Sequence, residues 1–105
     1  MSNIIKYIME DEGVIKGFFA INFKKGLPHL QHFYMDEPYR NINNLRKLAK
    51  VFTNIIKKLG YKTVYLHAKS QRQMKLITYF FKQKPYGLDE KQAWYLVDIN
   101  KGRLL

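Results

Sequence analysis

Near the N-terminus, apolar and polar positions form three consecutive stretches that each predict a β-strand. They are Ile4–Met9, Val14–Phe23 and Leu27–Met35, and the second is rich in β-branched and aromatic residues. An acidic, glycine-containing turn at residues 10–13 separates the first two, and a Lys-Lys-Gly turn at residues 24–26 separates the next two. We therefore expect the chain to begin with an antiparallel three-stranded meander.

Between residues 42 and 59 the apolar positions recur every three or four residues, which predicts an amphipathic helix. Asn41 is suited to the N-cap of this helix, and Gly60 follows the last apolar position, where a left-handed C-cap favours glycine. The residues of the apolar face are Ile42, Leu45, Leu48, Ala49, Phe52, Ile55, Ile56 and Leu59.

After this helix the pattern predicts another strand, a second helix and a last strand. Residues 63–67 are β-branched and aromatic, Ser70 is suited to cap a helix that ends before Pro85, and residues 93–99 form the final strand, followed by a tail at 101–105. A strand, a helix and a strand in succession imply a parallel crossover. We expect an α+β fold in the order β-β-β-α-β-α-β, with a mixed, largely antiparallel sheet, as a single domain over residues 1–105.

The composition excludes several classes of site and location. The chain contains no cysteine, so disulfides, thiolate catalysis and cysteine-based zinc sites are excluded. No apolar run approaches the ~20 residues of a membrane span, and the first residues show no secretory signal. We expect a cytoplasmic protein with no metal site and no membrane partner.

The net charge of +11 on 105 residues attracts polyanions such as nucleic acid, acidic proteins or phosphorylated cofactors. Two interpretations remain open. The lysines form an ordinary solvated surface, or a functional basic face exists on the polar side of the long helix. The candidate face consists of Arg46, Lys47, Lys50, Lys57 and Lys58.

The segment Tyr34-Met35-Asp36-Glu37-Pro38-Tyr39-Arg40 joins the third strand to the long helix. It resembles the motif of the GNAT acyltransferases, in which a strand ending in valine precedes a proline-containing turn, an aromatic residue and an arginine. The resemblance covers roughly residues 4 to 99 and lacks the first strand and two helices of that family. The degenerate motif is similar to those of GNAT-like proteins encoded by phages.

The resemblance implies a site for acetyl-CoA, whose pyrophosphate binds at the N-terminus of the long helix. Family members carry glycines where this chain has Asn43 and Leu45, and glycine lets the backbone approach the phosphates closely. Leucine at the second position departs most from the pattern. The cofactor-binding residues that the resemblance implies are Tyr34, Met35, Arg40, Asn41, Asn43, Asn44 and Leu45.

A second family signature, at residues 80–86, places Phe81 where family members have a tyrosine that protonates the departing thiolate. Tyr79 is the alternative acid if the register differs by two residues. His32, with His29 nearby, lies on the strand where the family often places a base. The simpler interpretation is that both histidines are half-exposed surface or packing residues.

Two functional hypotheses follow. The first is an acetyltransferase that transfers an acetyl group from acetyl-CoA to an amine acceptor, with the acceptor presented by a dimer partner in place of the absent helices. The second is a catalytically degenerate GNAT-like module that binds a protein or nucleic-acid partner through its basic surface.

Overall fold

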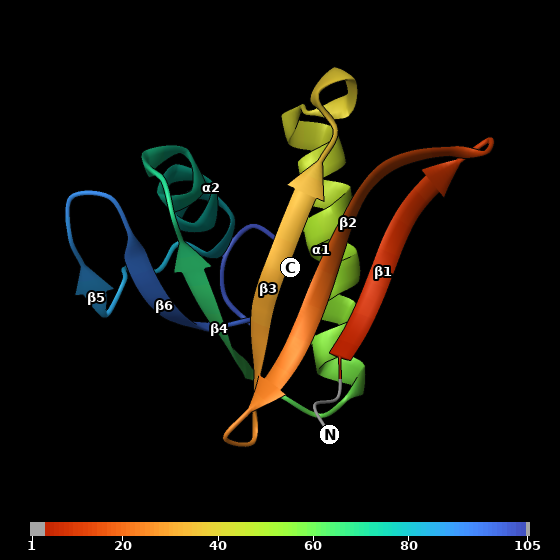
Figure 1. The fold of residues 1–105 in the computed structure, drawn as a ribbon. Helices are drawn as coiled ribbons and strands as arrows, with labels where there is room; N and C mark the ends of the chain where they lie inside the picture. The colour runs from red at the N-terminus through yellow and green to blue at the C-terminus, as the bar shows by residue number, and fades with distance from the viewer. Residues whose placement is uncertain (1–3, 105) are drawn as a thin grey trace.

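A computed structural model describes residues 4–104 (Figure 1). The strands are β1 (Ile4–Asp11), β2 (Val14–Lys24), β3 (Leu27–Met35), β4 (Thr63–Ala68), β5 (Gly87–Leu88) and β6 (Ala93–Asp98), and the helices are a short 3-10 helix η1 (Glu37–Tyr39), α1 (Ile42–Lys58) and α2 (Gln71–Phe81). The six strands form one sheet in the order β1-β2-β3-β4-β6-β5. The predicted mixed α+β fold is confirmed, with the two-residue strand β5 as an addition that the sequence pattern did not predict.

The N-terminal meander folds through two tight turns with left-handed residues. Lys25 and Gly26 have φ of 53° and 78°, and Glu12 and Gly13 have 51° and 79°, as type I′ hairpin turns require. Gly17 meets a different need, because β2 and β3 approach closely there. A Cβ atom at Gly17 would lie 2.5 Å from the carbonyl oxygen of Tyr34, so a larger residue would push apart the strands beside the end of β3.

β3 and β4 are parallel, as predicted, but they pair over a short distance only. The ladder joins His29 to Tyr65 and Leu30 to Leu66. A β-bulge then places Gln31 as an additional residue between Leu30 and His32, which pair with Ile21 and Ala20 of β2. Beyond this bulge β3 continues with β2, and Figure 1 shows it diverging from β4.

Both helices pack on the same face of the sheet, α1 behind β2 and β3 and α2 behind β4 (Figure 1). The side chain of Asn41 accepts a hydrogen bond from Asn44 N at the start of α1, and Ser70 does the same for Gln73 N at the start of α2. Both predicted N-caps are therefore present. Gly60 has a φ of +88° just after α1, and the left-handed Lys82 ends α2 before Pro85.

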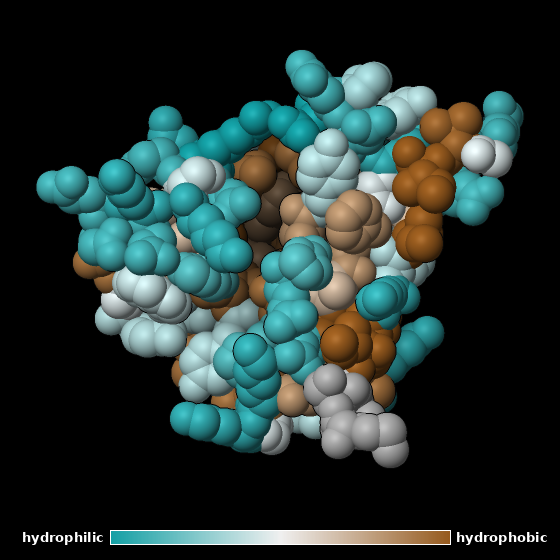
Figure 2. All heavy atoms as spheres, viewed as in Figure 1, coloured by the Kyte–Doolittle hydropathy of each residue, from teal (hydrophilic) through white to brown (hydrophobic). Residues whose placement is uncertain are grey.

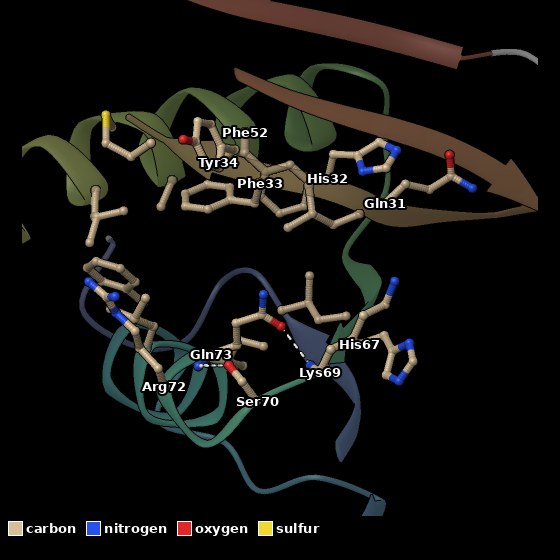
Figure 3. Close-up of a pocket in the computed structure, with 18 of the residues that line it drawn as sticks. Gln31, His32, Phe33, Tyr34, Phe52, His67, Lys69, Ser70, Arg72 and Gln73 are labelled. Carbon is tan, nitrogen blue, oxygen red and sulfur yellow. Dashed lines mark hydrogen bonds between the residues drawn. The ribbon is translucent and has the colours of Figure 1, made fainter. Parts of the chain in front are cut away.

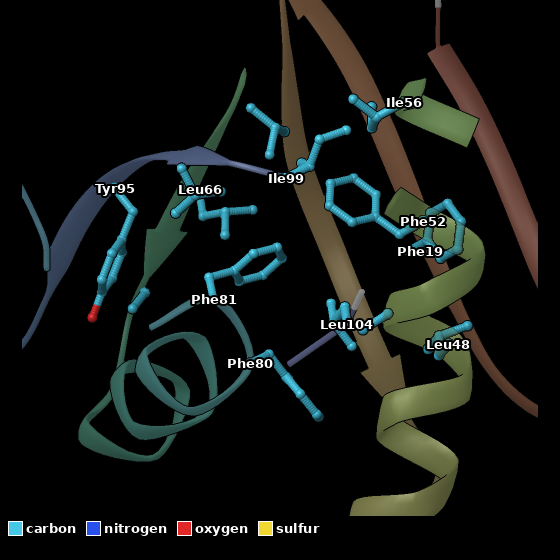
Figure 4. Packing of buried hydrophobic residues seen from close by; sticks show 14 of the residues in the cluster. Phe19, Leu48, Phe52, Ile56, Leu66, Phe80, Phe81, Tyr95, Ile99 and Leu104 are labelled. Atoms are coloured by element: carbon cyan, nitrogen blue, oxygen red, sulfur yellow. The ribbon is translucent and has the colours of Figure 1, made fainter. Parts of the chain in front are cut away.

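The tail predicted at residues 101–105 is not separate from the fold, because its described residues, 101–104, fold back onto α2. The N–H of Arg103 donates to the carbonyl of Phe80 at 2.8 Å, and Leu104 is buried in the core between the two helices (Figure 4). Gly102, with a φ of +102°, makes this approach possible, since a Cβ there would collide with the backbone of Phe80 and Phe81.

Candidate functional site

A cleft of about 490 Å³ opens where β3 and β4 diverge. Figure 2 shows it as a hollow lined by hydrophobic residues, and in Figure 3 the residues of β3 and α1 lie across from those of β4 and α2. Its inner part is apolar, with Phe33, Phe52, Leu66, Ile77 and Phe81 among the lining residues. Polar side chains lie along its margins, namely Gln31, His32, Tyr34, Arg40, His67, Lys69, Ser70, Arg72 and Gln73.

The strand ends that border the cleft have backbone groups available for hydrogen bonding. The ladder between β3 and β4 ends at Leu30 and Leu66, although β3 continues to Met35 and β4 to Ala68. The facing backbone groups of these strand ends therefore have no strand partner in the part of the chain that the structure describes. An extended ligand with amide groups can form hydrogen bonds with such edges as an additional strand would.

The loop between β3 and α1 is fixed by its own side chains. Arg40 donates from Nε and Nη2 to the carbonyl of Met35 at 3.1 and 3.0 Å. Asn44 donates from Nδ2 to the carbonyl of Tyr39 at 2.8 Å, while its N–H donates to Asn41 Oδ1 at 2.9 Å. The predicted cofactor residues Arg40, Asn41 and Asn44 thus hold the loop in place.

These internal bonds reduce the number of N–H groups that an anion could use. The N–H groups of Arg40 and Asn41 donate to Glu37 and Tyr39 within the loop. Within residues 4–104, the N–H groups of Ile42 and Asn43 have no acceptor outside the helix. The helix N-terminus can therefore offer an anion two backbone donors, and further stabilisation must come from cationic side chains nearby.

Such cations line a second hollow, which adjoins the cleft between the start of α1 and the side of α2. Arg40, Arg72 and Lys75 line it, together with Asn41 and Tyr79. Among residues 4–104, no carboxylate side chain lines either hollow. Four residues line both hollows, so a long ligand can extend from one to the other. They are Arg40, Leu45, Arg72 and Leu76.

The structure separates the two predicted catalytic residues. His32 lines the cleft, whereas Tyr79 lines only the second hollow. The Tyr79 hydroxyl accepts a hydrogen bond from Arg46 Nη2 at 3.1 Å, and the guanidinium of Arg103 lies 4.3 Å from the centre of its ring. The assignment of Arg46 to the solvent-exposed basic face is therefore wrong, because its side chain reaches across to α2.

The other residues that the resemblance implied are distributed around the two hollows. Tyr34 and Met35 line the cleft, and Leu45 lines both hollows with only 8% of its surface exposed. Leu45 thus fills space beside the helix N-terminus that a glycine would leave open. Asn43 is exposed at the start of α1 and lines neither hollow.

Sequence reasoning assigned no role at this site to His67, Ser70, Arg72 or Gln73, all of which line the cleft. His67 lies at the end of β4, where its ring stacks on Trp94 and its Nε2 is 2.8 Å from Gln92 Oε1. The predicted parallel pairing could have revealed it, because the C-terminal ends of parallel strands lie at the same edge of a sheet.

His29 lies outside the cleft, stacked on Tyr65 with their ring centres 4.4 Å apart. Burial, with the positive charge of Lys24 as a smaller cause, lowers the pKa of the His29 imidazole. Among residues 4–104, no three His, Cys, Asp or Glu side chains are placed together to hold a metal ion. None of the described helices is long and apolar enough to cross a membrane.

Comparison with known proteins identifies the fold. No protein-family model and no curated protein sequence matches this chain. Among solved structures it is similar to an acetyltransferase from Bacillus cereus (TM-score 0.77, 17% identity, covering 92% of this chain and 74% of that one). It is also similar to PaiA N-acetyltransferase from Thermoplasma acidophilum in complex with coenzyme A (0.75, 17%, 90% and 60%).

A third similar structure is aminoglycoside 6′-acetyltransferase type Ii (TM-score 0.69, 17% identity, covering 91% of this chain and 69% of that one). Each of these similarities covers at least nine tenths of this chain, so the resemblance found in the loop before α1 extends to most of the architecture. This chain has the fold of the GNAT acetyltransferases.

Proposed function

We propose that this chain is an N-acyltransferase that transfers an acetyl group from acetyl-CoA to an amine. The observation that carries the proposal is the divergence of β3 and β4 just after their two-residue ladder. It creates a cleft with free backbone edges on both walls, open to a cationic hollow at the N-terminus of α1. Acetyl-CoA has a matching order of parts, with a thioester, two amides along the pantetheine arm, and phosphates at the far end.

The residues present fit this ligand, with one departure. The edges of β3 and β4 beyond their ladder suit the pantetheine amides. Arg72 and Lys75 can neutralise the phosphates, since no carboxylate of the described side chains lines this hollow. The departure is the start of α1. Among the described residues, it offers an anion the N–H groups of Ile42 and Asn43, and it has Leu45 where a small residue would give more room. We therefore expect weaker phosphate binding than a glycine-rich loop provides.

The chemistry requires a proton acceptor and a stable leaving group. An amine must lose a proton to attack the thioester carbonyl, and His32 and His67 lie at the margins of the cleft, on β3 and β4. The leaving group is a thiolate, whose conjugate acid has a pKa of about 8.5 in free cysteine. Because a thiolate is this stable, reaction can proceed although the cleft has Phe81 instead of a tyrosine.

The test is the release of free thiol from acetyl-CoA in the presence of a panel of primary amines, with acetylation of the amine confirmed by mass spectrometry. We expect the double variant Arg72→Ala/Lys75→Ala to raise KM for acetyl-CoA at least about tenfold, the effect of losing a charge-assisted contact. The matched control is Lys57→Ala/Lys58→Ala, which removes the same charge at the far end of α1. Thiol release equal to the buffer rate with every amine would contradict the proposal.

One observation favours a second function, the binding of a polyanion by α1. Lys47, Lys50 and Lys57 are exposed, and α1 contains no acidic residue. Such a lysine face can bind nucleic acid by releasing counterions, with an affinity that falls steeply as salt rises. This function needs neither the cleft nor its histidines, so variants of α1 distinguish it from acetyl transfer.

A further inference from the structure

The strand β1 is the end strand of the sheet, and its outer edge has no partner among the described residues. It is eight residues long and has no additional residue of its own, because the β-bulge between β1 and β2 lies in β2. Met9 and Glu10 of β1 pair with Gly17 and Ile15, which makes Lys16 the additional residue. A long, regular strand with free N–H and C=O groups is a template for pairing with another strand.

The face of β1 that points away from the helices has a simple pattern of side chains. Its positions are Ile4, Lys6, Ile8 and Glu10, and Ile4 and Ile8 are 46% and 55% exposed. Figure 2 shows hydrophobic residues along the right-hand border of this face, where Figure 1 places β1. An exposed apolar residue at the centre of a free strand edge indicates a surface that is covered on association.

Charge favours a second copy of this chain at this edge. The whole chain has a net charge of +11, so two copies repel each other over most of their surface. Two segments are exceptions: residues 4–16, with two lysines and three carboxylates, and residues 87–98, with one lysine and three carboxylates. Only the first contains a long end strand of the sheet, because β5 at the other end has two residues. Two copies can therefore approach through their β1 strands, where like-charge repulsion is reduced.

The side-chain pattern also selects a register. In an antiparallel pair, residues directly opposite each other point to the same face of the sheet. When two identical β1 strands pair about a twofold axis, their outward faces therefore match only if the axis passes at a residue and not between two residues. Centring on Lys6 or Glu10 would place like charges opposite each other. Centring on Tyr7 would place Lys6 opposite Ile8. Centring on Ile8 places Ile8 opposite itself, and Lys6 opposite Glu10 of the second copy on both sides of the axis.

We propose that two copies of this chain form a homodimer by antiparallel pairing of their β1 strands, centred on Ile8, which continues the sheet across the axis. The interface is small, so we expect dissociation in the micromolar range or weaker. The dimer does not depend on the proposed acetyl transfer. β2 and β3 lie between β1 and the cleft, so the cleft remains open in both copies.

The test is sedimentation equilibrium over a range of concentrations, with two charge-reversal variants. Lys6→Glu alone and Glu10→Lys alone each place like charges opposite each other twice, and each should weaken self-association about tenfold. An equimolar mixture of the two variants restores opposite charges at both positions, so the mixture should form a heterodimer as stable as the unmodified dimer. The double variant Lys6→Glu/Glu10→Lys should also dimerise.

Three results would overturn the proposal. The first is an unmodified chain that stays monomeric at every concentration. The second is a single variant that dimerises as tightly as the unmodified chain, and the third is a mixture of the two single variants that fails to associate. Both substituted positions are exposed, so we expect the variants to keep the fold. Far-UV circular dichroism and thiol release from acetyl-CoA, which the dimer should leave unchanged, provide the controls for folding.

Discussion

Replacement of Leu104 by alanine tests whether the C-terminal segment belongs to the core. Leu104 is 7% exposed, and Figure 4 shows it between Phe80 of α2 and Leu48 of α1. Its loss therefore affects the contact between the two helices, which contribute to opposite walls of the cleft. A C-terminal tail without contacts to the core would tolerate the same substitution without consequence.

The loss of stability expected for Leu104→Ala follows from the apolar atoms that the substitution removes and from the cavity that it leaves. Leu→Ala removes three carbon atoms, worth about 2.4 kcal/mol at ~0.8 kcal/mol each. The cavity left between the helices adds roughly 1 kcal/mol if the site collapses partly. We expect a loss of about 3–4 kcal/mol in the free energy of unfolding. For a domain of this size, each kcal/mol lowers Tm by about 4–5 °C, so Tm should fall by roughly 12–20 °C.

The assay is urea unfolding followed by far-UV circular dichroism and by the fluorescence of Trp94, the only tryptophan of the chain. The matched control is Leu88→Ala, at a leucine that is 66% exposed, where we expect a change below about 0.5 kcal/mol. If Leu104→Ala and Leu88→Ala have the same midpoint and slope, the segment after Asn100 does not pack in the core as described.

Three further predictions concern other parts of the chain. Asn41→Ala should lower the free energy of unfolding by about 1 kcal/mol, because the first turn of α1 loses its cap; chemical unfolding that shows no change would contradict this. Changing Lys47, Lys50 and Lys57 together to glutamate should abolish any binding of a short DNA duplex, measured at two salt concentrations, and binding indifferent to this change would exclude the α1 face. The lowered pKa of His29 means that the folded chain resists its protonation, so this residue stabilises the fold above pH ~6.5 and its contribution is lost as the pH falls below that value. Tm should therefore fall less between pH 7.5 and 5.5 in His29→Asn than in the unmodified chain, and an equal fall in both would refute this.

The elements could be predicted from the sequence because each has a strong local signal. The three- to four-residue period defined α1, and Asn41, Gly60 and Ser70 marked helix ends where the structure has them. The parallel pairing of β3 and β4 followed from the order of elements alone. These features depend on backbone conformation and on contacts between residues close in sequence.

Features that depend on contacts between distant residues could not be predicted. Arg46 has the sequence position of a solvent-exposed residue, but the hydroxyl of Tyr79, 33 residues later, accepts its hydrogen bond. Gly102 and Leu104 gave no periodic signal, since a single buried leucine after a strand has no pattern. The margin of the cleft formed by His67 and Arg72 likewise depends on how β4 and α2 lie against β3.

The central claim is that the cleft between β3 and β4 binds acetyl-CoA, and isothermal titration calorimetry tests it most directly. We predict saturable binding of one acetyl-CoA per chain in the micromolar range, with affinity that is reduced by Arg72→Ala/Lys75→Ala and unchanged by Lys57→Ala/Lys58→Ala. Absence of heat from the unmodified chain at about 1 mM acetyl-CoA, the upper end of ordinary substrate affinities, would contradict the claim.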